Sequence, residues 1–149
     1  MIKECTSLEQ EGWLALREAL WSHGSSSEHL AEMVQQLAEP QRFAQFVAYS
    51  ENGFPVGFAE ASLRSDYVNG TESSPVAFLE GIYVVPNYRR QGIARELVVA
   101  VSQWAASRDC RELASDAALD NELSHTVHKM LGFAETERVV YFRKGLTPE

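Results

Sequence analysis

The sequence predicts a single α/β (α+β) domain over residues 1–149, with a mixed sheet of about six to seven strands and about four helices. Three observations lead to this fold class. Short β-branched and aromatic runs alternate with segments of helical periodicity, a strand leads through a glycine turn into an amphipathic helix, and another strand follows that helix. Two strands joined through a helix predict a parallel pair inside the mixed sheet.

Strand and helix signals alternate along the chain. They predict a first strand over 2–5, helices over 8–20 and 27–38, and strands over 43–50, 55–63 and 78–85. A helix over 94–106, a strand over 111–117, a helix over 122–131 and strands over 133–138 and 139–144 follow. Ser7 with Gln10 resembles a capping box for the first helix, and Asp120-Asn121 caps the last one. Glu51-Asn52-Gly53 predicts a hairpin turn.

The connection over residues 64–75 is long and polar for so compact a domain. It carries two apolar residues, Tyr67 and Val68, that we expect to be exposed. Long ordered connections often carry function. The sequence therefore predicts that this loop contributes to a binding site.

The composition is that of a globular protein, with 45% hydrophobic and 23% charged residues. No apolar run approaches the ~20 residues of a membrane span, and the first residues lack the layout of a signal peptide. Cys5 and Cys110 are isolated, with neither metal-ligand nor disulfide spacing, so we expect buried, inert thiols and no metal site. Together these features favour a reducing cytoplasm and no membrane contact.

The net charge of −8 argues against a general nucleic-acid-binding protein, which needs a basic face. It is compatible with a cationic small substrate that the protein's field attracts. The alternative is that the acidity serves solubility alone.

A basic glycine turn, Arg89 to Ala94, joins the central strand to the following helix, and Pro86 ends that strand. The N–H groups of the first helical turn carry partial positive charge and point outward. Gly92 allows the backbone to approach a ligand closely. Two arginines, Arg89 and Arg90, stand beside it, so the turn suits a pyrophosphate.

The pattern Arg89-x-x-Gly92-x-Ala94 between a strand and a helix resembles the pyrophosphate loop of the GNAT superfamily of acyl-CoA N-acetyltransferases. The element order resembles that family along nearly the whole chain. The resemblance implies a GNAT fold splayed at its central parallel strands, with acetyl-CoA as the co-substrate. It assigns the co-substrate site to the side chains of Arg89 and Arg90 and to the backbone of Ile82, Tyr83, Val84, Gln91, Gly92, Ile93 and Ala94.

Two residues near the last predicted helix also match the family. Asn121 matches the asparagine that contacts the CoA arm, and His128 stands where the family often has a tyrosine that protonates the leaving thiolate. Histidine can donate a proton near neutral pH. Whether His128 keeps that role, has a structural one, or leaves the step to water or another residue stays open.

A closer resemblance is to the aminoglycoside 6'-N-acetyltransferases. The stretches that carry it are residues 66–76, 78–84, 114–117 and 132–142. The resemblance implies acetyl transfer to the 6'-amine of these polycationic antibiotics, and a homodimer.

A polycationic substrate needs carboxylates spaced over its rings. Glu80 lies on the central strand and Asp116 ends the neighbouring parallel strand, so the two could flank one amine. The further substrate contacts that we expect are Asp66, Glu72 and Tyr67 of the long loop, with Tyr67 acting across a dimer as the resemblance suggests, and Trp21 and His23 at the end of the first helix.

Four of these residues have a purely structural alternative. Glu80 could be a carboxylate paired with an arginine, and Asp116 could cap the turn that follows it. Tyr67 and Trp21 could be ordinary core residues.

The reacting amine must be neutral to attack the thioester, so a carboxylate that accepts its proton is required. Asp116 is the first candidate for this base and Glu80 the second. Neither cysteine has a base beside it in sequence, which favours direct transfer without an acyl-enzyme. Two rivals remain, namely a GNAT enzyme for another cationic amine, such as a polyamine or a protein amino terminus, and a non-catalytic acyl-CoA sensor.

Overall fold

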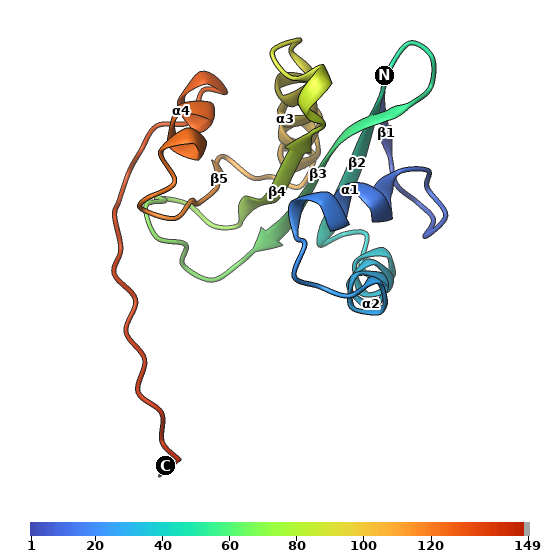
Figure 1. The fold of residues 1–149 in the computed structure, drawn as a ribbon. Helices are drawn as coiled ribbons and strands as arrows, with labels where there is room; N and C mark the ends of the chain where they lie inside the picture. Colours follow the sequence, from blue (N-terminus) through green and yellow to red (C-terminus); the bar gives the residue numbers. More distant parts are fainter. Residues whose placement is uncertain (148–149) are drawn as a thin grey trace. The chain divides into compact units, whose positions relative to one another are not determined.

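The computed structural model describes residues 1–147 and comprises two compact units, Met1–Asp116 and the chain from Ala117 onward (Figure 1). The elements of the first unit are β1 (Ile2–Glu4), α1 (Trp13–Leu20), α2 (Ser26–Ala38), β2 (Phe43–Tyr49), β3 (Pro55–Arg64), β4 (Val76–Val84), a 3-10 turn (Pro86–Tyr88), α3 (Ile93–Ser107) and β5 (Leu113–Ala114). The second unit contains α4 (Glu122–Met130).

The first unit is built on one mixed sheet with the strand order β1-β2-β3-β4-β5. The pairs β1–β2, β2–β3 and β3–β4 are antiparallel, and β4–β5 is parallel, as the helix between these two strands predicts. The predicted six to seven strands are not matched, because the sheet of the described residues has five.

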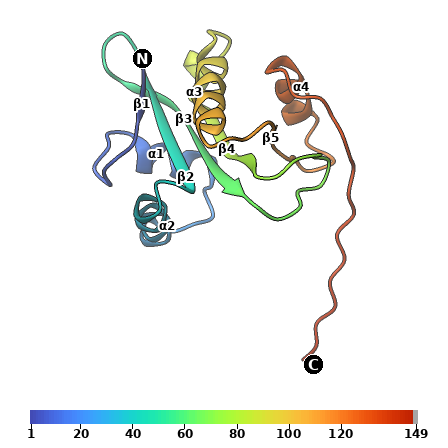
Figure 2. The same ribbon diagram turned by 180° about the vertical axis from the view of Figure 1, so that it is seen from behind.

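Helices cover both faces of this sheet. Figures 1 and 2 show α1 and α2 on one face and α3 on the other. On the face of α1 and α2, Trp13, Met33, Val47 and Phe58 form a hydrophobic cluster in which all four side chains are buried. Burial of such side chains is the main favourable contribution to folding, and here it fixes α1 against β3.

The first helix begins later than predicted. We expected it over residues 8–20, but α1 begins at Trp13 after Gly12, whose φ of 86° is left-handed. The side chain of Pro55 would lie 2.2 Å from a Cβ at this glycine, so only glycine fits there. Ser7 Oγ accepts a hydrogen bond from the amide of Glu9, which makes a local turn rather than the predicted capping box.

The prediction of two final strands is also wrong. Residues 133–146 form no helix or strand, and several of their apolar side chains are exposed, such as Tyr141 at 81% and Phe142 at 92%. A strand needs a paired neighbour for its backbone groups, and this segment has none in the described chain. The strand predicted over 111–117 is reduced to Leu113–Ala114 for the same reason, because it pairs with β4 at only two positions.

Among residues 1–147, no helix combines the length and the apolar character that a membrane crossing requires.

Candidate active site

The sheet opens between its two parallel strands. Pairing of β4 with β5 is limited to Ala77 with Leu113 and Phe78 with Ala114, while β4 pairs with β3 as far as Val84. Within residues 1–147, the backbone of Ile82, Tyr83 and Val84 therefore has a strand neighbour on the β3 side only. An open strand edge presents N–H and C=O groups that can pair with an extended, amide-containing ligand.

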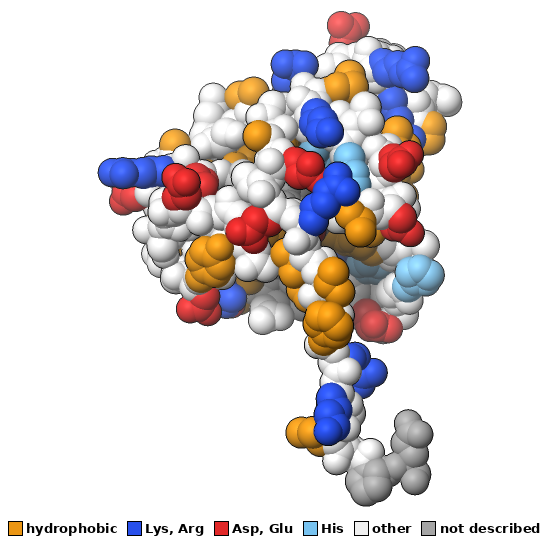
Figure 3. All heavy atoms as spheres, turned by 90° about the vertical axis from the view of Figure 1, so that its left-hand side faces the viewer, with side chains coloured by type: hydrophobic (Ala, Val, Ile, Leu, Met, Phe, Trp, Pro, Cys, Tyr) orange, Lys and Arg blue, Asp and Glu red, His pale blue; other side chains and the backbone are white. Residues whose placement is uncertain are grey.

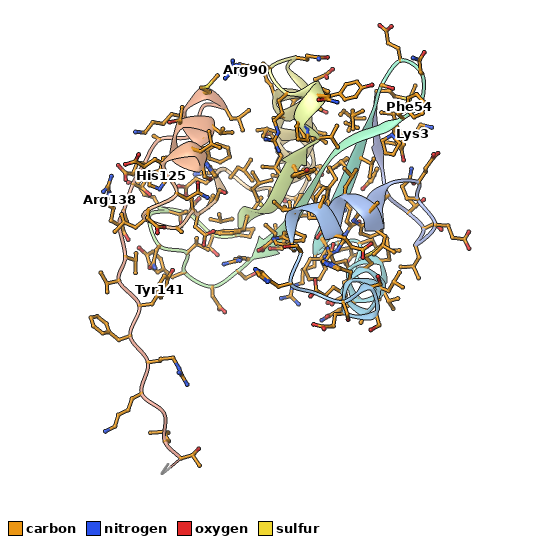
Figure 4. All side chains as sticks on the ribbon, in the orientation of Figure 1. Lys3, Phe54, Arg90, His125, Arg138 and Tyr141 are labelled. Atoms are coloured by element: carbon orange, nitrogen blue, oxygen red, sulfur yellow. The ribbon has the colours of Figure 1, made fainter. Side chains whose placement is uncertain are left out.

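The turn after β4 ends in the exposed N-terminus of α3. Gly92 is the N-cap residue with a φ of 84°. Among the residues that the structure describes, no side chain caps the first amides, and apart from the residues next to Gly92 no atom lies within 4 Å of a Cβ built on it. The approach to the first turn of a 15-residue helix is thus open to an anion. Arg90, exposed and with a φ of 63°, lies at the tip of this turn (Figure 4).

Two of the residues predicted for the pyrophosphate also have local structural bonds. Arg89 Nε donates a 2.8 Å hydrogen bond to the carbonyl of Val84, and its guanidinium lies 5.5 Å from the ring centroid of Tyr83. Gln91 Nε2 donates to the carbonyl of Asn87 at 3.4 Å. Arg89 therefore ties the turn to the end of β4, so that the strand edge and the helix N-terminus form one continuous surface.

Beside β4 lies a cavity of about 490 Å³, bounded by α1, α2, β3 and β4. Its lining includes two of the predicted substrate residues, Trp21 and Glu80. The charged side chains in the lining are three carboxylates and one guanidinium: Glu32, Glu60, Glu80 and Arg17. The cavity therefore has an acidic wall, which suits a cation.

Arg17 and Glu60, which were not among the predicted site residues, form a buried ion pair in the lining of this cavity. Their side chains are only 1% and 3% exposed. Glu60 also accepts hydrogen bonds from Trp13 Nε1 at 2.8 Å and from Gln36 Nε2 at 2.9 Å, and Arg17 forms a second ion pair, with Glu32. A buried pair with every polar atom bonded is held rigidly.

The sequence does indicate that both residues of this pair face the core. Arg17 lies four residues from both Trp13 and Trp21, on the apolar stripe of α1, and Glu60 interrupts the apolar strand β3. A charge at a core-facing position needs a partner of opposite charge, which could have been sought across the two elements.

Glu80 has two partners on β3. Arg64 Nη2 donates to both carboxylate oxygens, at 3.1 and 3.0 Å, and the hydroxyl of Ser62 donates to Oε2. The pairing of Glu80 with an arginine, raised above as the structural alternative, is therefore present. The carboxylate is nevertheless 34% exposed and lines the cavity, so it remains accessible to a ligand.

Trp21 forms a wall of the cavity and also packs against the core. Its ring meets Phe58 edge-on at 5.7 Å and lies 4.9 Å from the guanidinium of Arg17. A Cβ at Gly81 would come within 2.4 Å of the Trp21 ring, so β4 needs glycine at this position. His29 Nε2 donates to the carbonyl of Trp21 at 3.0 Å, which fixes the end of α1.

Asp116 lies close to Glu80 along the sheet. Ser115 Oγ donates to the carbonyl of Leu79 at 3.5 Å, so the residues that follow these two, Asp116 and Glu80, lie near the point where β4 and β5 part. Asp116 is exposed, and within residues 1–147 its carboxylate makes no hydrogen bond or ion pair. The alternative of a turn cap is therefore wrong.

The remaining predicted substrate residues lie outside the cavity lining: His23, Asp66, Tyr67 and Glu72. Tyr67 is 71% exposed, which excludes a core role, whereas Val68, expected to be exposed, is buried with Val76 and Phe78. The loop is anchored by Glu112, whose carboxylate accepts from the hydroxyl of Ser73 and the amide of Glu72. These hydrogen bonds, that of Ser73 first, lower the pKa of Glu112.

Asn121 and His128 belong to the second unit. Asn121 is the N-cap of α4, where its Oδ1 accepts from the amide of Ser124 at 3.1 Å. His128 Nδ1 donates to the carbonyl of Ser124 at 2.7 Å, and its ring packs edge-on against Phe133 at 5.3 Å. Both side chains thus have local structural roles, and their predicted roles toward a CoA arm and a thiolate stay predictions.

The two thiols are poor nucleophiles, but only Cys5 is buried as expected, and Cys110 is half-buried. Burial, followed by the nearby charge of Glu60, raises the pKa of Cys5 to about 12, and burial raises the pKa of Cys110. Both groups stay protonated near neutral pH, which disfavours a covalent acyl-enzyme. Among the described residues, no group of three or more His, Cys, Asp or Glu side chains could hold a metal ion.

An open strand edge, an uncapped helix N-terminus and an adjoining acidic cavity are together suited to acyl transfer from a pantetheine thioester to an amine. A model of the acetyltransferase (GNAT) family matches residues 9–133, and this chain belongs to that family.

The individual proteins to which the chain is similar belong to a narrower group than the family as a whole. The chain is 55% identical over 134 residues to an aminoglycoside N(6')-acetyltransferase type 1 of Acinetobacter genomosp. 13, with 90% of each chain covered. It is similar to the structure of an aminoglycoside 6'-N-acetyltransferase from Acinetobacter haemolyticus without ligand, with a TM-score of 0.91, 50% identity and 99% of each chain covered. It also resembles AAC(6')-Iy in complex with the bisubstrate analogue CoA-S-monomethyl-acetylneamine, with a TM-score of 0.91, 44% identity and 97% of each chain covered.

Proposed function

We propose that this protein transfers the acetyl group of acetyl-CoA to the 6'-amine of aminoglycoside antibiotics and so confers resistance to them. The observation that carries the proposal is the acidic cavity at Glu80, directly beside the open edge of β4. The edge and the α3 N-terminus fit a pantetheine arm and a pyrophosphate, and the cavity fits an ammonium-bearing ring. The relatives named above support the choice of acceptor.

Each residue of the site has a defined task in this proposal. The amides of residues 91–94 and the side chains of Arg89 and Arg90 hold the pyrophosphate, and the backbone of residues 82–84 orients the thioester and polarises its carbonyl. Asp116 accepts the proton of the acceptor amine, directly or through water, and Glu80 is the second candidate. The amine nitrogen then forms the bond to the acetyl carbon, while the carbon–sulfur bond breaks and sulfur keeps the electron pair.

The second unit completes the proposal. The family match crosses Asp116 and runs to residue 133, so we propose that both units belong to one GNAT domain. Asn121 is the candidate contact for the CoA arm, and His128 the candidate donor of a proton to the thiolate. Asp66, Tyr67, Glu72, His23 and Trp21 remain the candidates for the other substrate rings. We place the protein in the cytoplasm, where its two unpaired cysteines stay reduced.

A thiol-release assay over a panel of amines tests this function. We expect turnover with kanamycin-type compounds, and acetylation at the 6' position when the product is examined by NMR. Turnover with spermidine or a peptide amino terminus but not with aminoglycosides would assign the protein to another GNAT activity. Binding of acetyl-CoA without turnover of any amine would make it a sensor.

The pyrophosphate turn can be tested with a pair of glycines. Gly92→Ala should raise the Kd of acetyl-CoA by about tenfold, because an L-residue strains the left-handed turn and adds a methyl group over the helix amides. Isothermal titration calorimetry measures this change. Gly53→Ala is the matched control, because Gly53 also has a left-handed φ, 83°, and an open Cβ position, but lies in the β2–β3 turn. Equal Kd values for the two variants would contradict the assignment of the turn.

We also propose that the protein is a homodimer and that a second copy covers the apolar segment Val139–Phe142. The exposed fractions of Val140, Tyr141 and Phe142 are 71%, 81% and 92%. Figure 3 shows hydrophobic side chains spaced along this extended segment, and Tyr141 is labelled on it in Figure 4. Apolar, strand-forming residues of this density favour burial against another protein surface, and an identical chain is always available to supply one.

Phe142→Asp should convert the dimer to a monomer, because a charge would have to be buried in the apolar interface. Sedimentation equilibrium measures the mass. Phe54→Asp is the control, because Phe54 is a single exposed aromatic residue, 61% exposed, at the β2–β3 turn. A wild-type monomer would refute the dimer, and a dimeric Phe142→Asp variant would place the interface elsewhere.

A further inference from the structure

The carboxylate of Glu80, which lines the cavity, is paired with the positive charge of Arg64. Arg64, the last residue of β3, lies 3.0 Å from Glu80 Oε2 and 3.1 Å from Oε1. Its guanidinium also lies 3.7 Å from the ring centroid of Phe78, which holds the cation against β4 by a cation–π contact. Phe78 is 6% exposed, so this support is fixed.

This arrangement bears on a conflict within the proposed reaction. A carboxylate beside the acceptor attracts the ammonium form of the substrate, but only the neutral amine can attack. An isolated Glu80 would therefore improve binding while it lowered the fraction of reactive amine. An interaction that stabilises the bound substrate more than the transition state lowers kcat.

We propose that Arg64 acts through Glu80 by partly compensating the negative charge of its carboxylate. The carboxylate can then accept a hydrogen bond from an N–H group of the acceptor amine without stabilising the protonated, ammonium form of that amine. Arg64 and Ser62 occupy part of the carboxylate, and the face toward the cavity stays open for one further donor. The positive charge of Arg64 repels an ammonium group bound to the same carboxylate and so disfavours the protonated form of the amine. The ammonium proton then leaves to Asp116 or water, and the nitrogen lone pair is free to form the bond to carbon.

Among the described residues, no other cation is placed to compensate the charge of Glu80. The charged and titratable groups that line the cavity are Arg17 on α1, His29 and Glu32 on α2, Glu60 on β3 and Glu80 on β4. Asp116 follows β5 and is not part of this lining. Arg17 is paired with Glu60 and Glu32, and His29 bonds to Arg17 and the carbonyl of Trp21. Among residues 1–147, Arg64 is the cation that contacts Glu80.

The inference rests on the proposed function and is tested by the pH dependence of acetyl transfer to a kanamycin-type acceptor. For Arg64→Met we expect the KM for the acceptor to fall about two- to fivefold, because an unopposed Glu80 binds the ammonium more tightly, by the amount typical of an exposed ion pair. The acidic midpoint of the kcat profile should rise by the corresponding ~0.3–0.7 pH units, so that kcat falls at neutral pH and recovers at high pH.

Arg64→Lys preserves the charge and should keep the wild-type midpoint, and Arg64→Gln should behave like the methionine variant. In the Glu80→Gln background, Arg64→Met should no longer move the midpoint, because the carboxylate through which it acts is gone. A merely structural role for Arg64 predicts a lower kcat at every pH with an unchanged midpoint, and that result would overturn the inference.

The same experiment separates this inference from the proposed function. If Glu80→Gln alone changes neither KM nor kcat, Glu80 does not contact the acceptor, and the proposed site is wrong. If Glu80→Gln alters the kinetics but Arg64→Met leaves the midpoint unchanged, the site stands and only the role of Arg64 fails. Urea unfolding of each variant verifies that all of them are folded.

Discussion

Asp116→Asn should lower kcat for acetyl transfer by roughly 10²–10⁴-fold, the contribution typical of a general base, while the Kd of acetyl-CoA stays near its wild-type value. Asparagine keeps the size of the side chain but cannot accept a proton at neutral pH. Asp116 is exposed and makes no side-chain bond among residues 1–147, so its replacement should cost little stability. Steady-state kinetics and calorimetric titration of acetyl-CoA measure the two quantities.

Asp109→Asn is the matched control for this change. It removes the same charge from the first unit, at a position after α3 whose φ of 63° asparagine tolerates well. We expect its kcat to stay near wild type. A similar loss in both variants would mean that net charge, not a base at Asp116, limits the rate, and a parallel loss of acetyl-CoA affinity in Asp116→Asn would give Asp116 a structural role.

Glu60→Ala should reduce the free energy of unfolding by about 3–5 kcal/mol, the cost typical of removing one member of a buried ion pair. Arg17, 1% exposed, would keep only the exposed Glu32 as an ion-pair partner, and Trp13 Nε1 and Gln36 Nε2 would lose their acceptor. The loss at Trp13, which is fully buried, leaves a buried donor unsatisfied, whereas Gln36 is half-buried and lines the cavity. Urea denaturation followed by tryptophan fluorescence measures the change in unfolding free energy.

Glu39→Gln provides the comparison for this prediction. Glu39 pairs with Arg42 at 3.8 Å, and the two side chains are 45% and 59% exposed, so its loss should cost at most about 0.5 kcal/mol. Arg17→Met combined with Glu60→Leu should recover much of the stability lost in Glu60→Ala, because no buried charge remains. A Glu60→Ala variant as stable as Glu39→Gln would show that the pair is not a stabilising unit.

The centre of the fold could be predicted because its signals are local. Pro86 ends β4, Gly92 begins α3 in a left-handed conformation, and the apolar stripe of α3 follows at once. Each of these signals acts over a few residues and does not depend on distant partners. The same holds for α2, whose N-cap Ser25 accepts from the amide of Glu28.

The errors arose where distant partners decide the structure. Residues 133–144 have the composition of strands, but a strand exists only when its backbone groups are paired, and composition does not reveal whether a partner lies in reach. The start of α1 was misplaced because Gly12 must avoid Pro55, 43 positions along the chain. Local periodicity cannot register such a contact.

The candidate site was predicted in part for the same reason. Glu80 and Asp116 could be placed together because adjacent parallel strands bring their carboxyl ends to one edge. The ion pair of Arg17 and Glu60, and the pairing of Arg64 with Glu80, join different elements through side-chain geometry. A single sequence indicates that such charges need partners but not which partners they find.

The open edge of β4 also bears on the stability of the protein and on its amount in the cell. If acetyl-CoA completes this edge, it binds the folded chain and not the unfolded one, so it acts as a stabilising ligand, worth ~2.7 kcal/mol at a concentration of 100 times its Kd. Resistance to heat and to proteases would then follow the acetyl-CoA supply. A well-fed cell would accumulate more of the protein than a starved one, with no change in its synthesis.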